Sequence, residues 1–356
     1  MRKILLLSLI LTLSSCQLVQ QMPLEQNKNL NTSPTNKAEE AVITPPTYFE
    51  NGRYSIFSAN LDGSDLGEVV NHNKERTHIS VSHDGKKLLY VEYTKDLNKD
   101  GLVNHKDNKS AEINILDLES LETKSLTENK EFIDTAPNFS PDGRYIVFAS
   151  DRDKAYRYTS LDLYKLDLAS NEVMRFTKSM LATETDPTWT GNTIIYSYFL
   201  ANKLSNAELI TVDEDGTNSK TILNVAIDGG DFQSPFGDYE ATISPDGRMI
   251  AFSRYFSDDL THRGEPVGDR DVFIINRSGT DLRNLSGNAE ADTQPAFSPD
   301  SKLLAFTRMT EKESEIVIHN LETGEEHLLN FEHLSALKSH PAFGPDGKIW
   351  FAGERQ

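Results

Sequence analysis

An all-β fold built from six repeated four-stranded units is predicted by three features of the 356-residue sequence. A turn of the Ser-Pro-Asp-Gly type recurs along the chain, apolar β-rich runs flank each copy, and successive copies lie about fifty residues apart. The copies centre on Asp84, Asp142, Gly191, Asp246, Asp300 and Asp346. Four strands per repeat cannot bury their faces alone, so we expect the units to stack radially.

Each unit begins with a hairpin. In Phe139–Phe148, Pro141 sets φ at the turn, Asp142 caps it locally and Gly143 tolerates a positive φ. An alternating strand follows, as in Leu161–Leu166, and then a second turn such as Asp215-Gly216. A short fourth strand is expected to complete the unit.

The two ends of the chain are predicted to share one unit. The sequence ends at Trp350–Gly353, only two strands into the sixth unit, whereas Tyr54–Leu66 matches the third strand and second turn of Asp271–Leu282. We therefore expect a six-bladed β-propeller whose last blade is closed by N- and C-terminal strands, which removes two exposed sheet edges.

These turns at blade spacing resemble the WD40-like repeats of TolB-like six-bladed β-propellers over residues 48–356. That family includes TolB, which works in the periplasm beside a peptidoglycan-associated lipoprotein, and it is related to the propeller domains of prolyl oligopeptidase-type peptidases. The resemblance implies a protein- or peptide-binding module, and a TolB-like scaffold in envelope integrity or transport is one form of it. We expect no separate N-terminal α/β domain like that of TolB, since the preceding segment runs straight into blade strands.

The N-terminus has the pattern of an export signal. Arg2 and Lys3 precede an apolar run over Ile4–Leu13, and Ser14 and Ser15 stand before Cys16, the only cysteine. This segment resembles the lipobox of bacterial lipoproteins, which implies a signal peptide at 1–15, removed by cleavage, and acylation of Cys16 by chains such as palmitate. The alternative is an ordinary secretory signal with an incidental cysteine. Residues 16–47, rich in Gln, Asn, Thr and Pro, are expected to form a flexible tether.

Location and partners follow from these features and from the charge. Gln17 is not acidic, which by resemblance to sorted lipoproteins favours the outer membrane, on its periplasmic side or at the cell surface, if the source is Gram-negative. The net charge of −19 disfavours nucleic-acid binding, and lipid rather than surface charge would hold the chain to an anionic membrane. We expect a monomer.

A calcium-type loop is predicted at 96–107, within the first blade. Ca²⁺ loops place oxygen ligands at positions 1, 3, 5, 7, 9 and 12 and a glycine at position 6. The corresponding residues here are Asp96, Asn98, Asp100, Leu102 through its carbonyl, Asn104 and Asp107, with Gly101 at the turn. The loop resembles those of EF-hands and dockerins without their helices. The alternative is a polar hairpin tip, and a bound ion would be structural.

The first strand of each blade should line a central channel, and counting back from the position of Pro137 gives two rings. The outer ring is predicted to contain Arg76, Asp134, Glu184, Asp238, Asp292 and Lys338. The inner ring is predicted to contain His78, Ala136, Asp186, Glu240, Gln294 and His340. We expect a basic sector facing an acidic sector, which suits a peptide terminus, a polar ligand or a cation. The alternative is a solvated channel whose charges balance and seat the blades.

No catalytic motif stands out. The sequence contains no G-x-S-x-G, H-E-x-x-H, P-loop or G-x-G-x-x-G. We therefore expect a binding module and not an enzyme. The alternative is a hydrolase or lyase that uses the funnel to act on an envelope peptide or sugar, with His78 and His340 as the residues to test.

Overall fold

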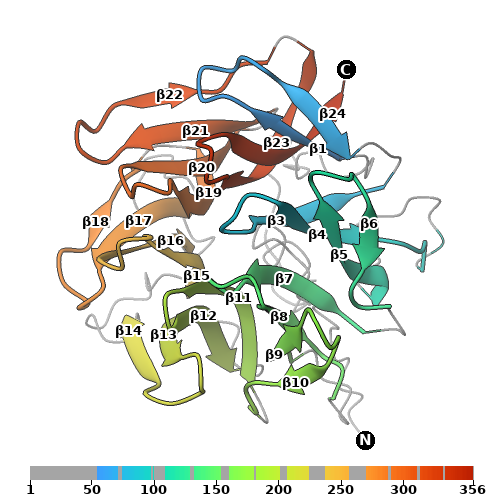
Figure 1. Ribbon diagram of the computed structural model, residues 1–356. Coiled ribbons are helices and arrows are strands. Elements are labelled where there is room, and N and C mark those ends of the chain that lie inside the picture. Colours follow the sequence, from blue (N-terminus) through green and yellow to red (C-terminus); the bar gives the residue numbers. More distant parts are fainter. Residues whose placement is uncertain are drawn as a thin grey trace, which may run out of the picture.

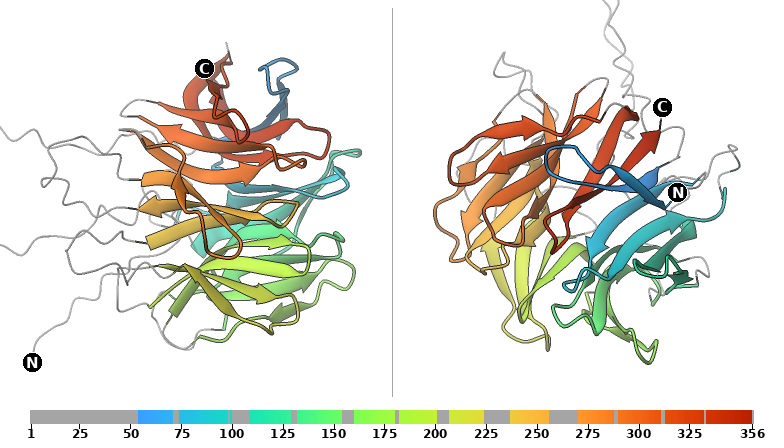
Figure 2. Two further views of the ribbon diagram at one scale, coloured as in Figure 1. Left: turned by 90° about the vertical axis from the view of Figure 1, so that its left-hand side faces the viewer. Right: turned by 45° about the horizontal axis from the view of Figure 1, so that its top comes forward.

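The computed structural model describes residues 54–70, 74–97, 99, 109–128, 132–153, 160–179, 182–200, 207–223, 237–255, 270–287, 290–310, 313–331 and 333–355. These residues form strands and turns in a propeller-like arrangement of four-stranded blades around an axis (Figures 1 and 2), as the repeat predicts. In the described ranges no helix has the length and apolar character needed to cross a bilayer.

Four antiparallel sheets contain four strands each, and each runs outward from the axis in chain order. The first contains β3 (Arg76–Val81), β4 (Lys87–Tyr93), β5 (Ala111–Asp117) and β6 (Thr123–Ser125). The second contains β7 (Asp134–Phe139), β8 (Tyr145–Ser150), β9 (Asp162–Asp167) and β10 (Val173–Arg175). The third contains β11 (Ala182–Thr190), β12 (Thr193–Leu200), β13 (Glu208–Asp213) and β14 (Lys220–Leu223). The fourth contains β15 (Gly237–Ile243), β16 (Met249–Tyr255), β17 (Arg270–Asn276) and β18 (Arg283–Asn284).

The remaining eight strands are assigned to one sheet that contains both ends of the described chain. Its first half is β19 (Ala291–Phe297), β20 (Leu303–Met309), β21 (Ser314–Asn320) and β22 (Glu326–Leu328). Its second half is β23 (Leu334–Phe343), β24 (Ile349–Arg355), β1 (Ser55–Ala59) and β2 (Gly67–Val70). The halves meet through one parallel pair, Ser314 with Leu337. The N-terminal β1 pairs antiparallel with the C-terminal β24 over Ser55–Ala59, beside it in Figure 1.

The recurring turn explains why each hairpin forms. The Ser140 hydroxyl donates to Asp142 Oδ1 at 2.6 Å, and the same Asp142 oxygen accepts the Arg144 N–H at 3.0 Å. Gly143 has φ 67°, which a residue without Cβ adopts at little cost. The hydroxyl of Ser82, Ser244 and Ser298 makes the same 2.6 Å bond in other sheets. The repeat is therefore a self-capped turn.

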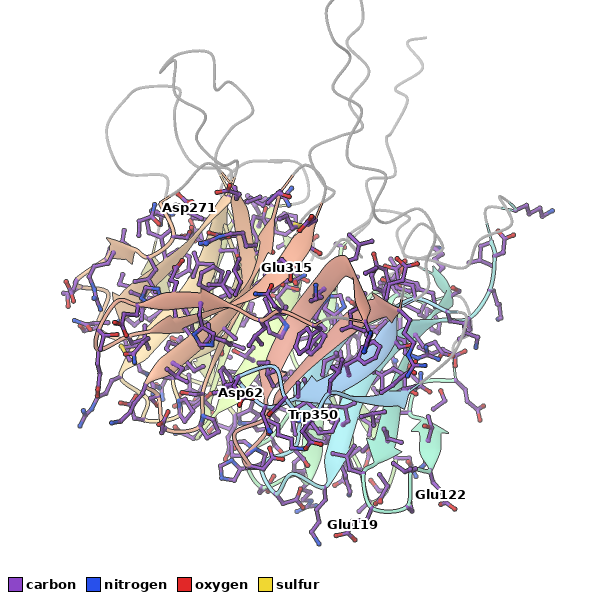
Figure 3. The ribbon with its side chains drawn as sticks, turned by 90° about the horizontal axis from the view of Figure 1, so that it is seen from above. Asp62, Glu119, Glu122, Asp271, Glu315 and Trp350 are labelled. Carbon is purple, nitrogen blue, oxygen red and sulfur yellow. The ribbon has the colours of Figure 1, made fainter. Side chains whose placement is uncertain are left out.

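The turns within the hairpins lie on one side of the molecule, which we call the tight-turn face. In Figure 3, Asp62, Glu119 and Glu122 lie toward this face, whereas Asp271 and Glu315, at the start of β17 and β21, lie toward the opposite one. Strands β3, β7, β11, β15, β19 and β23 all run toward the tight-turn face and place their side chains around the axis.

The core lies between neighbouring sheets. The second strand of four repeats carries a phenylalanine that is fully buried: Phe148, Phe252, Phe306 and Phe351. One cluster includes Ile56, Leu88, Tyr90 and Trp350, and it packs the sheet that contains both chain ends against the β3–β6 sheet. Burial of such an aromatic side chain, at about 1.5–3 kcal/mol per large apolar group, explains why these units stabilise one another.

Candidate functional site

Each of the six innermost strands is interrupted by a β-bulge at the same place. At this bulge one non-glycine residue adopts a positive φ between 49° and 59°. The six residues, which we call the bulge ring, are His78, Ala136, Asp186, Glu240, Gln294 and His340. They are the predicted inner ring. Positive φ is uncommon for such residues, and bulges turn side chains away from the regular pleat, so the repeat maintains this strain to aim six positions at the axis.

The bulge ring surrounds an axial cavity of about 120 Å³. The residue after the bulge contributes an apolar wall, consisting of Ile79, Pro137, Pro187, Pro295 and Pro341. A second cavity of about 350 Å³ shares several of these residues and continues past Phe139, Trp189 and Phe297 to turn residues such as His83 and Pro141. The two cavities therefore form one channel that runs from the tight-turn face to the bulge ring.

Side chains of the bulge ring connect one sheet to the next. The Asp186 carboxyl accepts the backbone N–H of Glu240. Glu240 Oε2 accepts the N–H of Gln294 at 2.9 Å, and Gln294 Oε1 accepts the N–H of His340 at 2.8 Å. Glu240 also accepts the Ser253 hydroxyl at 2.8 Å. Each acceptor thus satisfies an N–H that the bulge removed from ladder pairing.

The two histidines meet where the sheet containing both chain ends adjoins the β3–β6 sheet. The ring centroids of His78 and His340 lie 4.9 Å apart. The Gln294 amide nitrogen lies 3.1 Å from His340 Nε2, and since an amide nitrogen can only donate, Nε2 is the acceptor. The proton of His340 is therefore on Nδ1, which lies 3.0 Å from the Ser339 hydroxyl. Both imidazoles are neutral at pH 7, because burial lowers the pKa of His78 to about 4 and, together with His78, lowers the pKa of His340 well below its usual value.

Asp186 has the opposite perturbation. Burial, and secondarily the neighbouring Glu240 carboxylate, raise the pKa of Asp186 to about 8. Hydrogen bonds from the Thr185 hydroxyl and the Glu240 N–H counteract part of this effect. The Asp186 carboxyl is therefore largely protonated at neutral pH, and a proton-bearing acid shares the cavity with neutral imidazoles.

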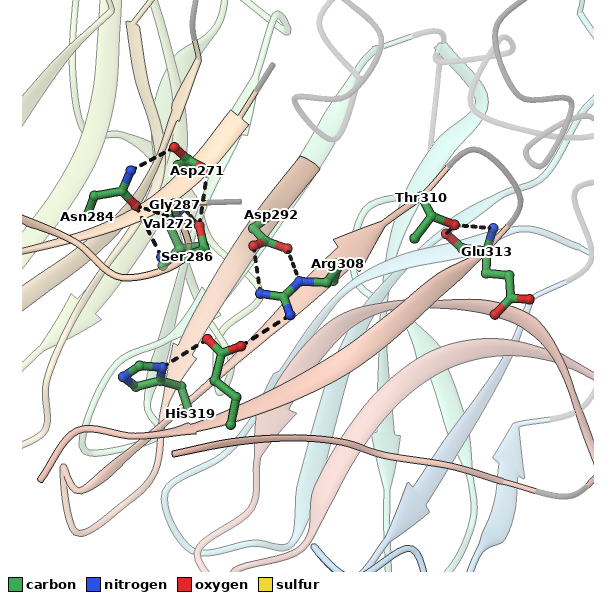
Figure 4. Close-up of polar contacts among 11 residues, drawn as sticks. Asp271, Val272, Asn284, Ser286, Gly287, Asp292, Arg308, Thr310, Glu313 and His319 are labelled. Carbon is green, nitrogen blue, oxygen red and sulfur yellow. Dashed lines mark hydrogen bonds and ion pairs between the residues drawn. The ribbon is translucent and has the colours of Figure 1, made fainter. Parts of the chain in front are cut away.

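The predicted outer ring is also present, but its charges are used differently from our expectation. All six side chains are buried, and most form ion pairs with a residue of a neighbouring strand or of the turn that follows it. The pairs are Arg76–Glu92 at 2.7 Å, Asp134–Arg152 at 2.8 Å, Asp238–Arg254 at 2.8 Å, Asp292–Arg308 at 2.9 Å (Figure 4) and Lys338–Glu315 at 2.8 Å, while Glu184 accepts the Thr177 hydroxyl. Arg76 and Lys338 thus do not form a free basic sector across from the acids, because Glu92 and Glu315 neutralise them locally.

Sequence reasoning did not identify these partners. In three hairpins the outer-ring residue and the residue sixteen positions later have opposite charge and face one another in register, as for Asp238 with Arg254. This spacing was available in the sequence and would have identified the pairs. The Asp292–Arg308 pair continues outward, since Arg308 also reaches Glu326 at 3.2 Å and Glu326 contacts His319 at 3.1 Å.

The other predicted sites lie mainly outside the described residues. Cys16 and the tether are among these, as are Asn98, Asp100, Leu102, Asn104 and Asp107 of the loop. Asp96 is described, and its Oδ1 accepts the Lys99 N–H at 2.6 Å. Among the residues that the structure describes, no group of three or more His, Cys, Asp or Glu side chains is arranged to hold a metal ion.

Comparisons with known proteins support the fold alone. No protein-family model matches the sequence, and no curated protein matches it. Among solved structures, a putative TolB from Agrobacterium tumefaciens has a TM-score of 0.62 and 17% identity, covering 85% of this chain and 98% of that one. TolB from Acinetobacter baumannii has a TM-score of 0.52 and 17% identity, covering 86% of this chain and 64% of that one. An oligogalacturonate lyase in complex with manganese has a TM-score of 0.51 and 15% identity, covering 82% of this chain and 80% of that one.

Proposed function

We propose that this chain is a lipid-anchored cell-envelope β-propeller that binds a segment of a protein or peptide in its axial channel. The observation that carries the proposal is the channel itself, which opens on the tight-turn face, has apolar and aromatic walls and ends at a polar ring. Concave, mostly apolar sites with a few convergent polar groups are typical of ligand binding. The fold shared with TolB is consistent with an envelope role.

The experiment is photo-cross-linking in intact cells from two positions on the tight-turn face. A photoreactive residue at the exposed His83 would stand at the channel mouth, and one at Glu119 would stand on the same face away from the channel. We expect a partner to be captured from position 83 and not from position 119. Equal capture from both positions, or none from position 83, would contradict axial binding.

We further propose that the eight-stranded sheet is two blades, which makes six in total, with β23, β24, β1 and β2 as the last blade. Support comes from the kind of pairing at the two contacts. The halves are joined by one isolated parallel bridge, Ser314 with Leu337, whereas β1 and β24 form a continuous antiparallel ladder of five residue pairs. Deletion of residues 54–66 should abolish cooperative thermal unfolding, whereas deletion of 17–47 should leave the melting temperature unchanged. A chain without 54–66 that melts like the parent would contradict this closure.

The anchor is tested separately. Cys16→Ala should move the protein from the membrane fraction to the soluble fraction and abolish incorporation of labelled palmitate, because Cys16 is the only thiol. Several acyl chains give durable anchoring, whereas a single one is marginal. Unchanged membrane association of the variant would contradict lipidation at this residue.

We also propose that the 96–107 loop binds Ca²⁺. The support is the succession of oxygen-bearing residues in the sequence, of which Asp96 is described. With a Kd of about 10⁻⁴–10⁻³ M, typical of extracellular calcium modules, about 10 mM Ca²⁺ stabilises the state that binds it by about 1.4–2.7 kcal/mol. Ca²⁺ at this concentration should therefore raise the melting temperature, and Asp100→Ala should remove the increase. An equal increase with Mg²⁺ or in the variant would contradict the assignment.

The second candidate function is an enzyme whose active site is the axial channel, and one observation favours it. Asp186 holds a proton at neutral pH while His78 and His340 are neutral, so the same cavity contains an acid and two bases. His78→Ala and His340→Ala should then abolish turnover of an envelope peptide or sugar while leaving the thermal transition in place. Unchanged turnover in these variants would show that neither histidine is catalytic.

A further inference from the structure

The bulge ring has one gap, and the gap is at Ala136. Five of its six positions carry a polar or titratable side chain, whereas Ala136 ends at Cβ. Ala136 lies on β7, which packs between β3 and β11, so its neighbours in the ring are His78 and Asp186. The gap therefore opens between an imidazole and a carboxyl, at the end of the channel.

A buried hydroxyl next to the gap makes no hydrogen bond to any residue that the structure describes. In three sheets the residue before the ring position is a hydroxyl that contacts the ring side chain: Thr77 with His78 at 2.8 Å, Ser339 with His340 at 3.0 Å, and Thr185 with Asp186. Thr135 occupies this place before Ala136. It is 1% exposed, and within the described part of the chain its Oγ1 has no partner. An unsatisfied buried hydroxyl is costly. Thr293, before the filled position Gln294, also has no partner among the described residues, so it is the combination of an unpartnered hydroxyl with the missing side chain at Ala136 that points to a polar ligand in the gap.

The polarity of the surroundings indicates what that group is. The described residues that line the 120 Å³ cavity include two carboxyl side chains and neither Lys nor Arg. The outer-ring cations Arg76 and Lys338 are held by Glu92 and Glu315. The carboxyl of Asp186 and a ring nitrogen of the neutral His78, which line the cavity, can accept hydrogen bonds. The hydroxyl of Thr135, which directly precedes Ala136 but is not a lining residue, can also accept one.

We propose that the gap at Ala136 binds a primary ammonium group, either the N-terminus or a lysine side chain of a peptide that enters from the tight-turn face. An ammonium has three donors and one positive charge, which matches three acceptors beside an acidic pair. The prolines of the apolar wall would surround the carbon atoms that precede the ammonium group. This inference rests on the proposed binding function and specifies the chemistry of its ligand.

Binding should also release a proton. Asp186 is largely protonated at pH 7, since its pKa is raised to about 8, and a cation beside it favours the carboxylate. The Asp186 carboxyl then loses its proton to buffer as the ammonium enters. An adjacent cation therefore displaces a proton from the site, which gives a signal separate from affinity.

The test uses three short peptides on the folded protein: trialanine amide, its N-acetylated form, and N-acetyl-Ala-Ala-Lys amide. Affinities are measured from the imidazole NMR signals of His78 and His340. We expect at least one amine-bearing peptide to bind about tenfold or more tightly than the acetylated trialanine, since a hydrogen bond to a charged group is among the stronger ones. The peptide that gains affinity identifies the source of the ammonium group. A free N-terminus and a lysine are thereby distinguished.

Two matched variants test the gap. Thr135→Val removes the unpartnered hydroxyl at the gap, and Thr293→Val removes another buried hydroxyl without a partner in the described chain, before the filled position Gln294. We expect Thr135→Val to weaken amine binding about tenfold and Thr293→Val to leave it unchanged. In calorimetry, the binding enthalpy should differ between Tris and phosphate buffers for the parent and become independent of buffer in Asp186→Asn.

Three results would overturn the proposal: equal affinity for acetylated and free peptides, equal effects of the two valine variants, or no binding by any amine. Cross-linking from position 83 decides whether the proposed function fails as well. If a partner is still captured there, the channel binds by other chemistry and only the ammonium assignment is wrong. If no partner is captured, the binding function itself is wrong.

Discussion

The outer ring and the bulge ring lie two positions apart on the same six strands, yet their side chains have different partners. In the outer ring, Asp238 is fully buried and its two oxygens accept two N–H groups of Arg254 at 2.8 and 3.0 Å. In the bulge ring, Asp186 faces the cavity and accepts from Thr185 and a backbone N–H. A carboxylate with an arginine partner within its own hairpin is part of the structure, whereas a carboxyl bonded by neutral groups at a cavity can exchange its proton for a ligand.

The largest expected effect comes from breaking an outer-ring pair. Asp238→Ala leaves the Arg254 guanidinium, whose side chain is 12% exposed, without its bidentate partner. We expect a loss of about 3–5 kcal/mol in the free energy of unfolding, measured by chemical denaturation. The double variant Asp238→Leu with Arg254→Met should recover most of the loss, because it removes the buried charge altogether. A single variant as stable as the parent would show that the pair does not seat the blade.

The second prediction concerns the pH dependence of the free energy of unfolding, to which Asp186 of the bulge ring contributes. Because the folded state raises the pKa of Asp186 from about 3.9 to about 8, the folded chain binds this proton more tightly than the unfolded chain. The stabilisation it provides is complete at low pH and is lost as pH rises toward 8. The parent should therefore lose stability relative to Asp186→Asn from about pH 4 to about pH 8, by at most about 1.4 kcal/mol per pH unit.

His78 and His340 act in the opposite direction at lower pH. The pKa of His78 falls to about 4 on folding, so the unfolded chain binds that proton more tightly between pH 4 and 6.5. Stability that depends on the neutral imidazoles is present above pH 6.5 and is lost on acidification. Between pH 4 and 6.5 the two titrations oppose one another, so His78→Ala and Asp186→Asn should change the slope of stability against pH in opposite directions there. Between pH 6.5 and 8 only Asp186→Asn should change it, and a slope that neither variant alters would exclude both titrations.

The smallest expected effect is at the hydroxyls before the ring. Thr135→Val replaces a buried, unpartnered hydroxyl by a methyl group and should raise the free energy of unfolding by about 1 kcal/mol. Thr185→Val removes the hydroxyl that donates to Asp186 and should lower it by about 1 kcal/mol. Changes of opposite sign in the melting temperatures of the two variants would establish that the Thr135 hydroxyl has no hydrogen-bond partner and that the Thr185 hydroxyl has one. Changes of equal sign would contradict this difference.

The ring positions could be predicted from the sequence because the repeat makes them countable. Once Pro137 marks a register, His78, Asp186 and their equivalents follow by spacing alone. The positive φ values could not be predicted in this way, and the ion-pair partner follows from sequence spacing only in the three hairpins where the two charges lie sixteen residues apart. A bulge between Thr77 and Ser80 shifts the pleat of β3, and this shift decides whether the Arg76 side chain points to the axis or to Glu92. The position of a bulge cannot be predicted from amino-acid composition. The direction of the channel side chains therefore depends on the three-dimensional structure.

The pairing of β1 with β24 has a consequence for biogenesis. A strand made first must wait for the strand made last before its ladder of five residue pairs can form. Contacts so distant along the chain slow folding and expose unpaired edges meanwhile. A chain synthesised from its N-terminus would thus complete its architecture only after its final residues emerge, which makes late truncations as damaging as early ones.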